Sequence, residues 1–383
     1  MLIENDRIAQ IVEPGESIGA DSVIDLDGLT VLPGFIDIHI HGAAGIDAMD
    51  ATAADLGRVG EFLARHGVTS WLPTLVPAEL EQYKQAVGAI GGMIRDQQEL
   101  FAPAALNADR MSALPGGGAR VLGVHYEGPF VNNEQCGALH REHFRVFNST
   151  AALAELPKIS DETAVHMMTL APEIDGGLAL IRELAKRNWV VSIGHTKATA
   201  GVLDQALDAG ARHLTHFMNA MTPLHHRSLG AVGWGLVHDD VTLDIIADGI
   251  HVNPAILKLV VSRKSAKNVS LISDAIAAAG QGDGDYEIWG ETITVSAGRT
   301  ENARGSIAGS VITMLDAVRM MSSLGSSDIE VAQMASLNPA RLLGVDDECG
   351  SIEAGKRADL LALDKNLNVR LTIIGGCIVF ENV

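Results

Sequence analysis

The chain has 383 residues, of which 47% are hydrophobic, and a formal net charge of −20. This length exceeds the usual single-domain range unless the fold is a barrel, which can reach about 250 residues or more. The acidic balance argues against nucleic acid and anionic membranes as partners. Three scattered cysteines are too few for a disulfide framework or a cysteine-type zinc site. With no signal peptide and no long uncharged apolar run, we expect a cytoplasmic protein.

Both ends of the chain carry short β-like runs. They cover residues 7–12 and 22–26 near the start, and residues 358–363, 369–374 and 377–380 near the end. We therefore predict one small β-sandwich domain, formed by residues 1–32 together with residues 346–383.

The middle of the chain, residues 33–345, alternates strand-like and helix-like patterns, as parallel βα units do. Helices are expected at residues 53–66, 178–186 and 199–209, among others. The eight expected strands cover residues 35–41, 70–75, 121–127, 167–171, 190–195, 214–218, 243–247 and 269–274. This order predicts an α/β fold, a closed (β/α)8 TIM-like barrel.

Two segments of this middle part do not fit the alternation. Residues 103–118 are rich in Pro, Ala and Gly and are predicted to be a loop, whereas residues 280–304 are predicted to be an inserted hairpin with arms at 287–289 and 292–295. No Gly-x-Gly-x-x-Gly follows the first strand, so the sequence gives no support for dinucleotide binding.

The first barrel strand carries two histidines, His39 and His41, separated by Ile40. Alternate residues of a strand point to the same side, so both imidazoles can reach one cation. Taken alone, the pair is more simply explained as two hydrogen-bonded core residues.

Further polar residues occur at the ends of later strands. Glu127 ends the third strand, His195 the fifth and Asp274 the eighth, while His216 lies within the sixth. Each could be a cap or a buried structural residue, but barrels of this kind build their active sites at these strand ends. Six such residues at one barrel end are better explained by a metal site. The mixed nitrogen and oxygen ligands suit Zn, Fe(II), Co or Mn.

Several motifs point to a known family. The most specific are Glu127-Gly-Pro129, Asn219-Ala-Met221 with His225-His-Arg227, and Asp248-Gly-Ile-His251, while Pro33-Gly-Phe-Ile-Asp37 marks only a wider superfamily. On these motifs the chain resembles the amidohydrolase superfamily and, within it, the N-acetylglucosamine-6-phosphate deacetylases. The reaction that this resemblance implies is removal of the acetyl group from N-acetyl-D-glucosamine 6-phosphate.

The resemblance also implies roles for single residues. Glu127, His195 and His216 match the principal metal ligands and Asp274 the catalytic acid–base, with His39 and His41 available for a second divalent metal. One or two ions per chain are implied, with Zn or Fe favoured. The resemblance implies that Arg227 reaches the substrate phosphate from a neighbouring subunit, and therefore that the protein is a homodimer. The further substrate contacts implied are Leu139 or His140, Asn219, Ala220, His251, Ile307, Ala308 and Gly309.

One departure and three alternatives stay open. The family usually has a His where this chain has Leu139, and His140 stands one residue further on. The substrate could be the galactosamine epimer, or the chain could be another amidohydrolase, although the carboxylated lysine of many such enzymes is disfavoured by Glu127. A non-catalytic scaffold is disfavoured because every expected ligand type is retained.

Overall fold

A barrel of parallel strands forms the centre of the computed structural model, which describes residues 1–13, 19–100 and 117–382. The strands follow one another in the order β14-β13-β12-β11-β10-β9-β7-β4. Their bounds are β4 (Phe35–Ile40), β7 (Val68–Leu75), β9 (Gly123–Glu127), β10 (Val165–Leu170), β11 (Val190–Ile193), β12 (His213–Leu214), β13 (Thr242–Ile246) and β14 (Val269–Ile272). A short strand, β8 (Arg120–Val121), also pairs with β7. The predicted eight-stranded α/β barrel is confirmed.

The barrel closes where β14 approaches β4. The backbone N–H of Asp274 donates to the carbonyl oxygen of His39 over 2.9 Å. The hydroxyl of Ser273 donates to the buried carboxylate of Asp37 over 2.5 Å. Since Ser273 and Asp274 follow directly after β14 and pair with β4, the closure itself brings Asp274 beside the His39–His41 segment.

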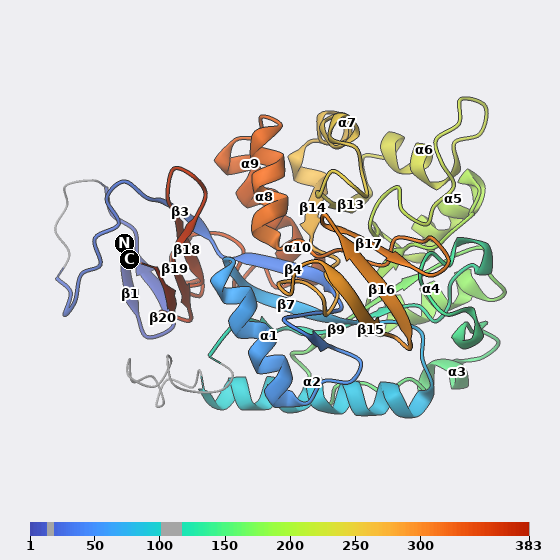
Figure 1. Ribbon diagram of the computed structural model, residues 1–383, viewed down its shortest axis with the longest axis horizontal. Helices are drawn as coiled ribbons and strands as arrows, with labels where there is room; N and C mark the ends of the chain where they lie inside the picture. Colours follow the sequence, from blue (N-terminus) through green and yellow to red (C-terminus); the bar gives the residue numbers. More distant parts are fainter. Residues whose placement is uncertain (14–18, 101–116, 383) are drawn as a thin grey trace.

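Helices surround the barrel (Figure 1). The expected helices at 53–66, 178–186 and 199–209 correspond to three of them. The helices are α1 (Ala53–Arg65), α2 (Leu80–Leu100), α3 (Thr150–Ala154), α4 (Gly177–Lys186), α5 (Ala200–Ala209), α6 (Gly230–Val237), α7 (Pro254–Lys264), α8 (Met314–Ser323), α9 (Asp328–Ala332) and α10 (Asn338–Leu343). Their apolar faces pack on the strands, as α1 does with Leu56, Val59 and Leu63.

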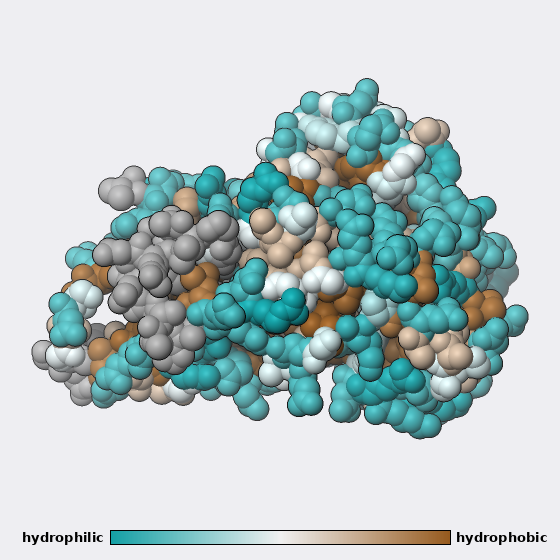
Figure 2. Space-filling model, turned by 90° about the horizontal axis from the view of Figure 1, so that it is seen from below, coloured by the Kyte–Doolittle hydropathy of each residue, from teal (hydrophilic) through white to brown (hydrophobic). Residues whose placement is uncertain are grey.

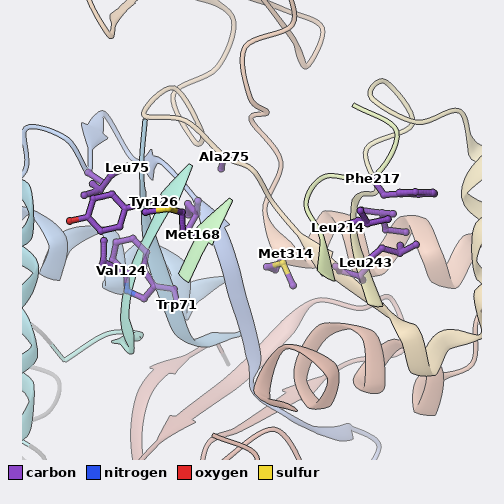
Figure 3. Close-up of a cluster of buried hydrophobic side chains, with 14 of the residues drawn as sticks. Trp71, Leu75, Val124, Tyr126, Met168, Leu214, Phe217, Leu243, Ala275 and Met314 are labelled. Carbon is purple, nitrogen blue, oxygen red and sulfur yellow. The ribbon is translucent and has the colours of Figure 1, made fainter. Parts of the chain in front are cut away.

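The main hydrophobic core lies between the strands and these helices. It includes Trp71 of β7, Tyr126 of β9 and Leu243 of β13, all fully buried (Figure 3). Strands of a parallel barrel are covered on both faces, which explains why every residue of β4, β7, β9 and β14 is buried.

The two ends of the chain meet beside the barrel (Figure 1). A separate antiparallel sheet contains, in order, β20 (Cys377–Glu381), β19 (Val369–Ile374), β18 (Leu360–Leu363) and β3 (Thr30–Pro33). A hairpin of β1 (Leu2–Glu4) and β2 (Arg7–Gln10) packs on it through the fully buried Ile8. The predicted β unit from both chain ends is confirmed, while its boundaries at residues 32 and 346 remain a prediction.

Three local expectations differ from the structure or lie outside it. Residues 22–26 form no strand and are mostly exposed, Val23 by 84%, and within the described part of the chain no strand pairs with them. The insert has three antiparallel strands and not two: β15 (Gly284–Ile288), β16 (Glu291–Ser296) and β17 (Arg299–Asn302). The predicted loop at 103–118 lies outside the described residues except for its last two positions.

The surface is largely hydrophilic on the face that Figure 2 draws. Hydrophobic residues gather there only in separate areas. Among the described residues, no helix combines the length and the apolar character that crossing a membrane requires.

Candidate metal and active site

Six nearly fully buried side chains meet at the carboxyl ends of the barrel strands. They form two groups, in each of which the possible ligand atoms all lie within 4.8 Å of one another. The first group contains Glu127, His195 and His216, and the second contains His39, His41 and Asp274. All six residues that the sequence selected as ligands or acid–base are therefore brought together.

The backbone bends sharply at three of these positions. His195, His216 and Asp274 adopt φ values of 48°, 33° and 50°. Residues other than glycine rarely adopt this left-handed region, at a cost of about 1–3 kcal/mol each. His216 also lies two residues beyond the end of β12 and not within the strand, as the sequence had suggested. A turn immediately after the strand, and not the strand itself, aims this imidazole at the others.

The first group surrounds one point. Oε1 of Glu127 lies 2.9 Å from Nε2 of both His195 and His216, and the two Nε2 atoms are 3.1 Å apart. Nδ1 of His195 lies 2.7 Å from the carbonyl oxygen of Gln135. A carbonyl only accepts, so Nδ1 carries a proton, and Nε2 is the ring nitrogen that could bind a cation. Two imidazole nitrogens and a carboxylate oxygen in this arrangement fit a divalent cation.

The second group lies directly beside the first. Oδ1 of Asp274 is 3.3 Å from Nε2 of His39 and 3.2 Å from Nε2 of His41. Nδ1 of His41 lies 3.2 Å from the Thr74 carbonyl oxygen, which again leaves Nε2 as the ring nitrogen that could bind a cation. Oε2 of Glu127 is 3.3 Å from Nε2 of His41. Glu127 therefore lies between the two groups and could contribute to both.

The electrostatics of the metal-free site favour ionised carboxylates. Burial would raise the pKa of Glu127, but the charge of His39 and hydrogen bonds from His195 and His216 hold it well below its usual value. Burial likewise opposes ionisation of Asp274, yet His39 and His41 lower its pKa. Burial opposes the charge on His216, but Glu127 raises its pKa to about 9. Against the effect of burial, Asp274 and Glu127 also raise the pKa of His41, so without a cation protons on His41 and His216 balance the carboxylates, and metal binding would release them.

A cavity of about 290 Å³ opens onto these groups. Six of the predicted substrate-binding residues line it: Leu139, Asn219, Ala220, His251, Ile307 and Gly309. The sequence interpretation missed Gly137, Ala138, Trp289 and Ser306, which also line it. The Trp289 ring packs edge-on against His41 with centroids 5.1 Å apart. Because Trp289 comes from the insert, no strand-end pattern could have identified it.

Three predicted substrate residues do not line this cavity. His140 has its ring 3.2 Å from Glu142 and 3.6 Å from Glu291, so Leu139 and not His140 faces the site. Ala308 is fully buried in the apolar cluster beneath the insert. Arg227 is exposed on the loop before α6.

Known proteins resemble this chain over nearly its whole length. The model of the amidohydrolase family matches residues 30–379. An N-acetylgalactosamine-6-phosphate deacetylase from Escherichia coli O157:H7 is 40% identical, over 93% of this chain and 89% of the relative. An N-acetylglucosamine-6-phosphate deacetylase from Bacillus subtilis is 38% identical, over 94% of this chain and 85% of the relative.

A solved structure agrees with these sequence matches. It is a mutant N-acetyl-D-glucosamine-6-phosphate deacetylase from Mycobacterium smegmatis in complex with N-acetyl-D-glucosamine 6-phosphate, 31% identical with a TM-score of 0.84. The match covers 99% of this chain and 94% of that one. The resemblance inferred from the motifs is confirmed, and the chain belongs to the amidohydrolase family.

Proposed function

We propose that the chain is a metal-dependent amide hydrolase that converts N-acetyl-D-glucosamine 6-phosphate and water into D-glucosamine 6-phosphate and acetate. The observation that carries this proposal is the pair of ligand groups around Glu127, open to one cavity, in a chain related to hexosamine-phosphate deacetylases. The relative from Escherichia coli O157:H7 supports a second candidate, the same reaction on the galactosamine epimer.

Glu127, His195 and His216 would hold the principal metal, and His39, His41 and Asp274 would hold or adjoin a second. Zn or Fe(II) suits these ligands best, and Co or Mn is compatible with them. A divalent metal in such a site polarises a carbonyl oxygen and lowers the pKa of water to about 7.

Asp274 would move the protons of the reaction. Its carboxylate lines the cavity, and its lowered pKa keeps it ionised and able to accept a proton. It takes one proton from the attacking water and gives it to the amine nitrogen as the carbon–nitrogen bond breaks. The acetyl carbon keeps the water oxygen, and the sugar leaves with a free amine.

Arg227 would bind the substrate phosphate from the partner subunit of a homodimer. Two features support this assignment: Arg227 does not line the cavity of its own chain, and it lies on an exposed loop between Leu224 and Leu229, which are 58% and 39% exposed. A planar guanidinium is well suited to phosphate. Asn219, Ala220 and His251 would position the rest of the sugar phosphate within the cavity.

The decisive test is acetate release from both acetylated hexosamine 6-phosphates and from their unphosphorylated forms, with Zn or Fe(II) present. We expect turnover of the glucosamine phosphate and poor turnover of both free sugars. Preference for the galactosamine phosphate would select the second candidate. Failure to release acetate from either phosphate would contradict both.

A further inference from the structure

A buried histidine–carboxylate pair lies next to the candidate metal site. Nε2 of His213 is 2.9 Å from Oδ2 of Asp244, and both side chains are 0% exposed. Nδ1 of the same imidazole lies 2.7 Å from the Thr242 hydroxyl. A buried pair of this kind seldom adds net stability over an apolar one, because both groups lose their hydration. Its other contacts therefore indicate what it does.

The second oxygen of Asp244 holds the backbone of a candidate ligand. Oδ1 accepts a hydrogen bond from the backbone N–H of His216. The backbone carbonyl of Asp244 accepts a hydrogen bond from the N–H of Phe217 over 2.8 Å. One residue of β13 thus holds two consecutive residues just beyond the end of β12.

His216 needs such support more than His41 and His195 do, and unlike His39, whose Nδ1 also lacks a partner among the described residues, it does not lie within a strand. Its strand, β12, is only two residues long, and its own φ of 33° is unfavourable for a residue with a side chain. Nδ1 of His195 and of His41 each lies against a backbone carbonyl, whereas within the described part of the chain Nδ1 of His216 has no hydrogen-bond partner. The hydrogen bond to Asp244 holds the backbone and not the ring.

We propose that Asp244, held in place by His213, is a positioning residue that fixes His216 for metal binding. His213 occupies Oδ2, which leaves Oδ1 facing the amide of His216. Without this acceptor the residue can relax from its left-handed conformation, and its Nε2 moves away from the point shared with Glu127 and His195. This inference rests on the proposed metal site.

The test measures zinc binding without substrate, by competition with a chelator, together with the rate of zinc release. Partners that orient metal ligands typically contribute about 10–100-fold to metal affinity. We expect Asp244→Ala to weaken zinc binding by about that factor, and Asp244→Asn to weaken it less because an amide oxygen still accepts a hydrogen bond.

Two substitutions of His213 test the same role with Asp244 unchanged, in case the Asp244 variants do not fold. His213→Gln keeps a donor for Asp244, whereas His213→Leu removes it, so only the second should speed zinc release. Asp359→Ala is the control, since this buried carboxylate pairs with Arg120 and the Gly375 amide and does not contact the site. We expect it to lower thermal stability and leave zinc affinity unchanged.

Wild-type zinc affinity in folded Asp244→Ala and His213→Leu would overturn the inference, as would an equal loss in Asp359→Ala. The proposed function fails differently. If the wild-type protein binds no zinc, both the proposed metal site and this inference are wrong. A wild-type protein that binds zinc but releases no acetate contradicts the activity and leaves the role of Asp244 in place.

Discussion

Polar side chains find their hydrogen-bond partners in opposite ways at the mouth of the barrel and at the starts of the outer helices. Helices α1, α8 and α9 begin with Thr52, Thr313 and Ser327, each paired with an acidic residue three positions on in a complete capping box. There, the cap side chain and the acidic side chain each bond to a backbone N–H within one turn of the same chain segment. At the mouth, Glu127 instead meets imidazoles from other strands, such as His195, 68 residues away.

This difference separates local stability from function. A capping box satisfies backbone donors and contributes about 0.5–2 kcal/mol to stability wherever the helix lies. The mouth gathers ionisable groups whose mutual contacts shift their pKa values and place possible metal-binding atoms close together. Breaking the mouth should therefore abolish chemistry in a folded protein, whereas breaking a cap should lower stability in an active one.

The largest effect is expected from the first ligand group. His195→Ala or His216→Ala removes one of the nitrogens that face Oε1 of Glu127, so the principal metal should be lost and acetate release with it. Elemental analysis of the purified variants measures the metal directly, with circular dichroism to establish folding. Full metal occupancy in a folded variant contradicts the assignment of these ligands.

Asp274→Asn should come next. Asparagine keeps the size of the side chain but cannot accept the proton, and general acid–base catalysis is typically worth about 10²–10⁴-fold, so kcat should fall by roughly that factor. KM should change little. The lowered pKa of Asp274 places the acid limb of the pH profile below the ordinary carboxyl range, and this limb should vanish in the variant. Turnover within a few-fold of wild type would assign proton transfer to another group, with His251 the next candidate.

Arg227→Ala should act on substrate binding alone. A hydrogen bond to a charged group is worth about 1.5–3 kcal/mol, so KM for the phosphorylated sugar should rise about 10–150-fold with metal content unchanged. An equal loss for the unphosphorylated sugar indicates a structural role. Mixing Arg227→Ala with His195→Ala should restore part of the activity if subunits exchange, because one hybrid site is then intact. No rescue despite demonstrated exchange favours a site built from one chain.

The smallest effect is expected at the start of α1, where Thr52→Ala should cost about 1 kcal/mol of unfolding free energy without changing kcat. Hydrogen bonds from Thr52 and Arg58 lower the pKa of Asp55 to about 2 in the folded protein. Because the pKa of Asp55 is lower in the folded than in the unfolded protein, its ionised carboxylate stabilises the fold at pH values above the unfolded pKa. This stabilisation is lost as the pH falls from about 4 to about 2. Urea midpoints at pH 7 and pH 2 should therefore differ less for Thr52→Ala than for wild type, whereas Thr52→Ser should behave as wild type.

Much of the barrel could be predicted from the sequence, because its signals are local. Short, mainly apolar runs such as Val269–Ile272 and amphipathic stretches such as Ala53–Arg65 reveal strands and helices within a few residues. Residues 22–26 have the same kind of apolar pattern but form no strand, since pairing depends on a neighbour that the local pattern does not reveal.

The sequence by itself determined the candidate ligands and their grouping at one end of the barrel, because a barrel brings the carboxyl ends of its strands to one face. Only the tertiary structure decided how these side chains meet. Three features depend on contacts between segments distant in sequence. They are the left-handed turn at His216, the hydrogen bond from the His216 amide to Asp244, and the packing of Trp289 from the insert against His41. Hydrogen bonds and ring contacts between distant segments do not change the spacing of apolar residues in either segment. The local sequence pattern therefore cannot predict them.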